Sequence, residues 1–331
     1  MQSHTYSITG RQLLGIAVPI LAAFFACILG LRLADWAGWF PRYSDDAGLQ
    51  HQVRQANSRH PAQIVFVGDS TCWCGIDPTE FSRQIPGRIP AVNLSLFIWF
   101  DLDRYAEQAA DFARSNPGQV KWVVLLVCGA KPSNNTETPD YAARWSQLQS
   151  EHMAEVQGPR RFWGQDDLFD SNLMRERLAP LILPQALRNR GAGYFGFMNE
   201  MSAFMTAHNG GRFDIGEYVP APNHVLSDYW HLAPQFFTKC QDFRGKMPAG
   251  AKLAIGFTPA SLGDQPRGSH PYYLACLKQW KDWINADLVL TNLPELLPPP
   301  CFAPGGHLNA LGQEMFTSAV AKEFAPVLRS K

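Results

Sequence analysis

The clue to the architecture is the stretch Gln63-Ile-Val-Phe-Val-Gly-Asp-Ser-Thr-Cys-Trp-Cys74. Residues 64–67 form a short apolar run rich in β-branched side chains, which is typical of a buried strand in a parallel sheet. Gly68, Asp69 and Ser70 follow at once, so we expect the Ser70 hydroxyl at the carboxyl edge of the sheet, where open α/β sheets bind ligands. The tripeptide alone is equally compatible with an ordinary turn, because all three residues favour turns.

Length and charge limit the classes of protein to consider. The 331 residues are enough for one large domain or two small ones, and 46% hydrophobic with 18% charged residues is typical of a folded chain. Lys+Arg and Asp+Glu are equal at 29 each, so the chain has no general positive field. We therefore expect no nucleic-acid partner.

The N-terminal part carries a long apolar run. Residues 13–33 are almost wholly apolar, and about 20 such residues suffice to span a bilayer. Trp36 and Trp39 follow the run and suit a membrane interface. The alternative is a cleaved signal peptide, but the residues after the run form a poor cleavage site. We therefore predict that residues 1–40 form a cytoplasmic tail and a single transmembrane anchor in the cytoplasmic membrane, with the rest on its periplasmic or extracellular side.

Beyond the first strand, apolar runs alternate with helical patterns. The clearest run is Lys121-Trp-Val-Val-Leu-Leu-Val127. Such alternation predicts an α/β fold with a parallel sheet and right-handed crossovers. The predicted strands are 64–67, 91–94, 121–127, 252–257 and 287–291, and the predicted helices are 78–84, 101–115, 272–284 and 313–328.

Two segments depart from this alternation. Residues 41–61 are polar and are predicted to form a juxtamembrane linker with a short helix. Residues 141–235 mix helical patterns with glycine-rich stretches such as Asn209-Gly-Gly211, and we interpret them as an insertion over the sheet edge. The insertion is either a substrate lid or a structural cap without ligand contact. The domain that contains it is predicted to cover residues 62–331.

A second candidate for chemistry stands near the C-terminus, in Cys301-Phe-Ala-Pro-Gly-Gly-His-Leu-Asn-Ala-Leu-Gly312. His307 follows a Pro/Gly-rich loop and precedes an amphipathic helix. A lone histidine is more often a structural residue than a catalyst. This loop, however, is expected to return to the sheet edge that carries Ser70, where His307 Nε2 could take the serine proton and pass it to a leaving group.

The two segments together resemble the first and last sequence blocks of the SGNH (GDSL-type) hydrolase superfamily. Gly68-Asp69-Ser70 matches the first block, and His307-Leu308-Asn309 with Gly312 matches the last. The resemblance extends from residue 63 to the C-terminus. It implies a three-layer α/β/α fold with a parallel flavodoxin-like sheet, Ser70 as nucleophile and His307 as general base. It also implies an oxyanion donor in the Ser70 N–H, supported by Asp69, and no cofactor or metal.

The blocks that supply the other oxyanion donors depart from the family pattern. Ser95 stands where the second block commonly has a glycine, which is tolerable because the donor is a backbone N–H. Lys131 stands where the third block usually has an asparagine. Either Asn134 or Asn135, shortly beyond, supplies the missing donor, or Lys131 itself stabilises the charge.

The sharpest departure concerns the acid that orients the histidine. The family has an aspartate three residues before the histidine, and this chain has Pro304 there. Losing that carboxylate typically costs several powers of ten in rate. A Ser–His dyad, an acid from elsewhere such as Asp264, or no catalysis are the alternatives.

The anchor and the degenerate third block more loosely resemble the membrane-anchored branch of the superfamily, which includes the teichoic acid D-alanyl transfer and alginate O-acetylation proteins. That resemblance implies acyl transfer on a cell-surface polysaccharide, or another acylated carbohydrate, beside a membrane-bound O-acyltransferase. The leading hypothesis is therefore an extracytoplasmic serine esterase or O-acyltransferase that forms an acyl-Ser70 intermediate. The alternative is a non-catalytic polysaccharide-binding or accessory protein with the same fold.

The cysteines and aromatic residues leave further alternatives open. Apart from Cys27 in the anchor, the cysteines are expected outside the cytoplasm, where disulfides persist. Their spacing does not match paired Cys-x-x-Cys zinc knuckles, so we expect no zinc site. A redox protein with a reactive Cys72 or Cys74 at a helix start is a third reading. Ten tryptophans are compatible with sugar stacking but also with ordinary packing.

Overall fold

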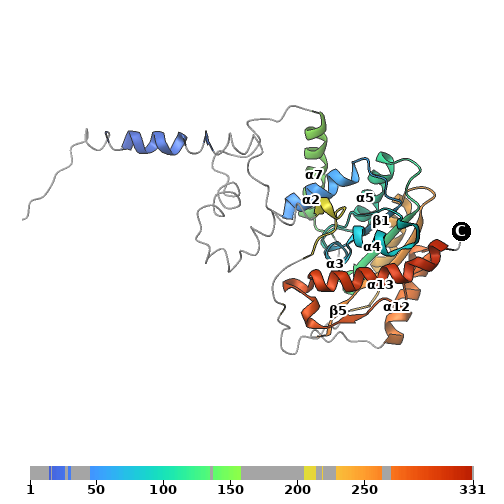
Figure 1. The fold of residues 1–331 in the computed structure, drawn as a ribbon. Coiled ribbons are helices and arrows are strands. Elements are labelled where there is room, and N and C mark those ends of the chain that lie inside the picture. Colours follow the sequence, from blue (N-terminus) through green and yellow to red (C-terminus); the bar gives the residue numbers. More distant parts are fainter. Residues whose placement is uncertain are drawn as a thin grey trace, which may run out of the picture. The chain divides into compact units, whose positions relative to one another are not determined.

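The structure is a computed structural model, and it describes residues 15, 17–26, 29–30, 45–134, 137–157, 205–213, 218, 229–262 and 270–329. The chain divides into two compact units, residues 1–43 with 155–183 and residues 44–154 with 184–331. The second unit contains the sheet and the sequence-predicted site residues (Figure 1).

A five-stranded parallel sheet forms the centre of this unit. Its strands lie in the order β2-β1-β3-β4-β6, which by rank along the chain is the 2-1-3-4-5 order of flavodoxin-like folds. The predicted α/β class with a parallel sheet is thus confirmed. The strands are β1 (Ile64–Gly68), β2 (Ala91–Asn93), β3 (Trp122–Cys128), β4 (Lys252–Thr258) and β6 (Leu288–Val289), and a separate two-stranded sheet pairs β5 (Ala260–Ser261) with β7 (Leu296–Leu297).

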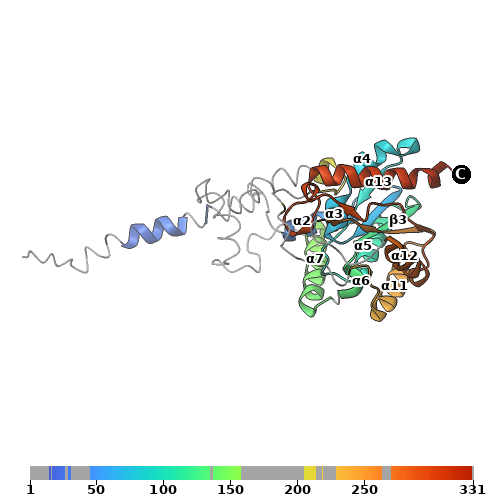
Figure 2. The same cartoon turned by 90° about the horizontal axis from the view of Figure 1, so that it is seen from below.

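Helices cover both faces of the sheet, which makes a three-layer α/β arrangement. Figure 2 shows α4 and α13 on one side of the strands and α5, α11 and α12 on the other. The helices are α2 (Asp45–Ala56), α3 (Ser70–Gly75), α4 (Pro78–Gln84), α5 (Leu102–Ser115), α6 (Lys131–Asn134), α7 (Pro139–Gln157), α11 (Pro234–Lys246), α12 (His270–Ile284) and α13 (Ala310–Arg329), with single 3₁₀ turns at Pro86–Arg88, Pro299–Cys301 and Pro304–Gly306.

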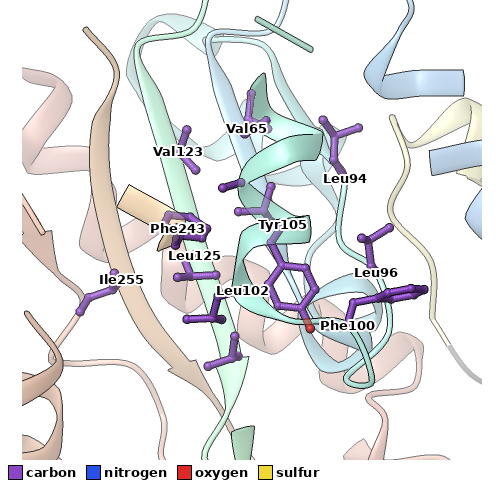
Figure 3. Close-up of a cluster of buried hydrophobic side chains, with 14 of the residues drawn as sticks. Val65, Leu94, Leu96, Phe100, Leu102, Tyr105, Val123, Leu125, Phe243 and Ile255 are labelled. Carbon is purple, nitrogen blue, oxygen red and sulfur yellow. The ribbon is translucent and has the colours of Figure 1, made fainter. Parts of the chain in front are cut away.

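The alternation of side chains along each strand separates two hydrophobic cores. Val65 and Val67 of β1 and their neighbours on β3 and β4 pack against α2, α5, α11 and α12 (Figure 3). Ile64 and Phe66 point to the other face and pack against α4 and α13, where Phe81 and Phe324 lie. Because every strand residue of β1 is buried, the strand appears in the sequence as an uninterrupted apolar run.

Strand register places the ends of the three central strands together. β1 pairs with β3 from Ile64↔Trp122 to Gly68↔Leu126, and β3 pairs with β4 as far as Cys128↔Thr258. The residues that follow β1 therefore lie beside the last residues of β3 and β4. This is the carboxyl edge at which the sequence predicts Ser70.

Element boundaries differ most from prediction at the sheet edge and after β1. The strand predicted at 287–291 is assigned only as Leu288–Val289, although Asp287 N and Leu290 N still donate to backbone carbonyls of β4. A short edge strand of this kind offers little template for pairing with another chain. The predicted helices begin only at residue 78, and a helix start near Cys72 or Cys74 entered only with the redox interpretation, because the six residues of α3 carry little helix propensity of their own.

The stretch predicted as a juxtamembrane linker contains a full helix of the domain. In α2, Leu49, Val53 and Ala56 are buried in the core against α5. The predicted short helix is therefore longer than expected, and its apolar face contributes to the core. Its polar residues are not confined to an outer face, because Gln52 is fully buried while Arg54 is exposed.

Parts of the predicted insertion lie on the domain where the structure describes them. Residues 205–213, which we call the strap, lie along the free edge of β2, where Asn93 N donates to Asn209 O at 2.9 Å. Gly210 lies at φ +89°, and a Cβ there would come within 2.2 Å of Asn93 O, so only glycine fits.

The apolar run predicted as the anchor, 13–33, is described at residues 15, 17–26 and 29–30. Residues 17–26 are helical. Among the residues that the structure describes, we find no helix with the length and apolar character needed to cross a membrane.

Candidate active site

The turn after β1 is shaped by a glycine that no other residue could replace. A Cβ at Gly68 would lie 1.7 Å from Leu126 O of the neighbouring strand β3. The close approach lets the chain leave β1 directly into α3. Ser70 is therefore the first residue of that helix, and its own N–H has no acceptor within the helix.

Asp69 holds this turn in place. Its Oδ1 accepts a hydrogen bond from Thr71 N at 2.9 Å, as an N-cap of α3, and its Oδ2 accepts from Cys128 N at 2.8 Å. The side chain is fully buried. Asp69 thus connects the Ser70 turn to the end of β3, a supporting role that concerns backbone geometry.

A threonine pair extends this support to β4. Thr71 Oγ1 lies 2.6 Å from Thr258 Oγ1, and it also donates to Asp69 Oδ1. Thr258 is the last residue of β4 and is paired in register with Cys128. Sequence reasoning did not single out Thr258, although a polar residue ending an apolar run at the site edge was a usable signal.

The C-terminal motif is built around Asn309. Its Nδ2 donates to Pro300 O at 2.8 Å and Phe302 O at 3.2 Å, while its Oδ1 accepts from Gly312 N at the start of α13. Gly312 is required by close packing, because a Cβ there would lie 2.2 Å from Cys301 O. These contacts fix the loop that carries His307.

The loop brings His307 to the serine. His307 Nε2 lies 2.9 Å from Ser70 Oγ, across 237 positions of sequence. Ser70 is only 6% exposed, so the hydroxyl lies in a largely desolvated position. When Nε2 is unprotonated it accepts the serine proton, which is the geometry that a nucleophile and its general base require.

Ser95 does not present its backbone N–H to the site. Ser95 N donates to Asn93 Oδ1 at 3.0 Å, and the residue is fully buried. Asn93 Nδ2 in turn donates to Cys72 O and Ile76 O, which anchors the C-terminal end of α3. Asn93 is a positioning residue of the α3 turn that the sequence analysis missed.

The Lys131 ammonium binds backbone carbonyls and is not directed at the predicted oxyanion position. Its Nζ donates to Ile98 O at 2.6 Å and to Phe100 O at 2.5 Å, and the residue is 2% exposed. Burial lowers the pKa of Lys131 to about 8, although the carboxylates of Asp69 and Asp101 oppose that effect. Its charge is directed at the loop after β2.

The remaining candidates are less completely described. Asn134 ends α6, and its side chain, like Asn135 and Asp264 as whole residues, lies outside the described part of the chain. Pro304 begins the 3₁₀ turn Pro304–Gly306, directly before His307. The carboxylate expected by the family pattern is therefore not supplied at that position.

The cysteines near this edge bear on the zinc and redox interpretations of the sequence. All six cysteines within the described residues are buried and form no disulfide with one another, and those residues include no His/Cys/Asp/Glu cluster suited to a metal ion. Burial raises the pKa of the Cys72 thiol, and that of Cys128 as well. Because a reactive cysteine needs a low thiol pKa, the environment of Cys72 argues against the redox reading.

Comparisons with known proteins add no relative to this description. No protein-family model matches the chain, and neither a curated protein nor a solved structure matches it significantly.

Proposed function

We propose that this chain is a serine esterase or O-acyltransferase of the SGNH type that forms an acyl-Ser70 intermediate. The observation that supports it is the 2.9 Å contact between Ser70 Oγ and His307 Nε2, made by the two residues that the motifs single out. A binding protein has no need for this pair. The buried supports of the turn, Asp69 and Thr258, are what a precisely held nucleophile requires.

The reaction would proceed in two halves. His307 Nε2 takes the proton as Ser70 Oγ attacks the acyl carbonyl, and the Ser70 N–H faces the developing oxyanion. The imidazolium then gives its proton to the departing alkoxide as the bond between that oxygen and the acyl carbon breaks. The product of this half is acyl-Ser70. Water or an acceptor hydroxyl attacks that ester in the second half, so the same residues serve hydrolysis and transfer.

The proposal extends to place and substrate on sequence grounds. The apolar run at 13–33 would anchor the chain in the cytoplasmic membrane as a single pass, with the sheet domain on its periplasmic or extracellular side. There the acyl esters of a cell-surface polysaccharide are the substrate, and a membrane-bound O-acyltransferase is the proposed partner.

A second candidate function is a non-catalytic polysaccharide-binding or accessory protein of such an acyltransferase. Two observations favour it. The Ser95 N–H is committed to Asn93, and the Lys131 ammonium is committed to two backbone carbonyls. The backbone donor expected at Ser95 and one of the alternatives for the third block, Lys131, are thus engaged elsewhere, and in this function a partner would supply their role.

Intact-mass spectrometry of the full-length chain after treatment with a fluorophosphonate or 4-nitrophenyl acetate tests the proposal. We expect one adduct on the wild type, none on Ser70→Ala, and labelling slowed by about 10²- to 10⁴-fold in His307→Ala, the usual contribution of a general base. Ser146→Ala is the matched control, because Ser146 is an exposed residue of helix α7 whose hydroxyl, within the described residues, donates to Ala142 O of its own helix.

The outcomes separate the two functions. Adduct formation that survives Ser70→Ala would remove Ser70 as the nucleophile. A folded wild type that forms no adduct alone but does so with its membrane partner would favour an enzyme completed by that partner. Absence of an adduct in both settings would leave the accessory function.

A further inference from the structure

The loop that follows β2 presents an exposed tryptophan at the catalytic edge of the sheet. Trp99 is 51% exposed, whereas Phe100, its neighbour in the chain, is fully buried. β2 lies next to β1, the strand that leads into Ser70. The loop also meets the end of β1, since Leu96 N donates to Gly68 O at 2.9 Å. An exposed indole on a loop at the same sheet edge as a candidate nucleophile is more informative than a scattered surface aromatic residue.

The backbone on both sides of Trp99 is tied to the domain. Lys131 Nζ donates to Ile98 O and Phe100 O, the carbonyls on either side of the tryptophan. Tyr105 Oη donates to Phe97 O at 2.9 Å, and Figure 3 shows Tyr105 and Phe100 within the buried cluster. The loop is thus held by a buried ammonium and a buried phenol.

The same loop is packed against the helix that begins with Ser70. The Phe97 ring lies 5.5 Å from the ring of Trp73, a buried residue of α3. A shift of the loop would therefore disturb the packing of α3. The Phe97–Trp73 contact therefore links the loop that carries Trp99 to the helix that begins with Ser70.

A second aromatic ring stacks on the indole. The Tyr141 ring lies parallel to Trp99, with a 10° interplanar angle and 5.8 Å between centroids, and Tyr141 is itself held edge-on by Phe100. Pyranose rings offer an apolar C–H face with positive polarisation, which complements the negative face of an aromatic ring. We propose that Trp99, backed by Tyr141, is a stacking platform for a pyranose ring of the saccharide that carries or receives the acyl group.

This inference rests on the proposed function for the identity of the saccharide, but its test does not depend on catalysis. Saccharide binding is measured by saturation-transfer NMR titration of the full-length chain bearing Ser70→Ala, so that turnover is absent. The probes are cellohexaose, chitohexaose and hexagalacturonate. The chain is purified in a detergent without a sugar headgroup, because such headgroups would compete for the platform.

We expect at least one hexasaccharide to bind. Trp99→Ala should raise its Kd about tenfold or more, and Trp99→Phe should raise it by no more than about threefold, because a benzene ring keeps a stacking face. Phe237→Ala is the matched control, since Phe237 is 46% exposed and lies on α11, where it contacts Trp283. That variant should leave the Kd unchanged. Thermal melting verifies that each variant is folded.

Several results would overturn the proposal. These are the absence of binding by all three hexasaccharides, an unchanged Kd in Trp99→Ala, or an equal effect of Phe237→Ala. A Trp99→Ala variant altered only in vesicle binding or self-association would assign the indole to a membrane or to a second copy. An active Ser70 without Trp99-dependent binding would overturn this inference alone, and the converse would overturn only the catalytic proposal.

Discussion

Lys131 lies just after β3, where a positive charge could meet an acyl oxyanion, yet its ammonium is directed into the domain. Both carbonyls that it binds, those of Ile98 and Phe100, belong to one loop. Keeping a charge in this environment is costly, which is why burial lowers the pKa of Lys131 to about 8 from its ordinary 10.5. The residue therefore affects stability in a way that depends on pH.

The direction of that dependence follows from proton binding. Between about pH 8 and 10.5 the unfolded chain holds the Lys131 proton and the folded chain has released it, so the unfolding free energy rises with pH across this window. The neutral amine keeps two N–H donors, enough for both carbonyls. We expect the unfolding free energy of the wild type, relative to that of Lys131→Met, to rise by up to about 3 kcal/mol from pH 8 to 10.5, as measured by urea unfolding. If the difference in unfolding free energy between the two proteins stayed constant with pH, the lowered pKa of buried Lys131 would be contradicted.

At the scale of elements, the strap is the part of the predicted insertion whose attachment is described. Trp73 Nε1 donates to Gly210 O at 2.9 Å, which connects the strap to α3. The Arg212 guanidinium lies over the Trp73 ring, 4.7 Å from its centroid. At the other end, His208 Nδ1 lies 2.6 Å from Asp77 Oδ2. The strap is thus attached to two helices as well as to β2.

Asp77 serves the strap and a helix at once, and substitutions can separate the two roles. Its Oδ1 caps α4 by accepting from Thr79 N and Glu80 N, while its Oδ2 faces His208. Asp77→Ala should lower the unfolding free energy by about 1–2 kcal/mol for the lost cap, plus the lost histidine contact. Asp77→Asn keeps a capping oxygen and should cost less.

Urea denaturation of these variants, together with His208→Ala, checks this assignment. In the His208→Ala background, Asp77→Asn should have a smaller effect than in the wild type, because the imidazole that faces Asp77 Oδ2 is gone. Equal costs for Asp77→Asn and Asp77→Ala would mean that the cap contributes nothing measurable.

For the domain as a whole, stability comes from two apolar cores, one on each face of the sheet. Within the described residues the cysteines are part of these cores or of the site edge, and they form no disulfide with one another. Burial raises the pKa of the Cys240 and Cys276 thiols to about 12. They therefore behave as small apolar residues and not as a covalent frame.

Because the described cysteines are buried and form no disulfide with one another, we expect their thiols to react slowly and the melting temperature to be independent of reductant. With Ellman's reagent, the six described cysteines of the native protein should react far more slowly than after unfolding in guanidinium. Dithiothreitol should leave the melting temperature unchanged, whereas loss of a disulfide would typically cost about 2–4 kcal/mol. A melting temperature lowered by several degrees in reductant would show that the domain depends on a disulfide.

The sequence by itself determined the parallel sheet and the serine–histidine candidates. Buried parallel strands are continuous apolar runs, so β1 and β3 could be located from local composition alone. Ser70 and His307 were recognisable because each follows a glycine-containing motif at a predicted sheet edge. Local signals of this kind need no knowledge of distant residues.

Only the tertiary structure decided what the supporting residues do. Thr258 meets Thr71 because strand register aligns the ends of the central strands, and register depends on pairing between distant segments. The N–H of Ser95 was expected at the oxyanion, and the ammonium of Lys131 was one alternative beside Asn134 and Asn135, but nearer acceptors engage both groups. A buried donor binds the acceptor that packing brings within reach, and no local pattern in the sequence encodes that choice.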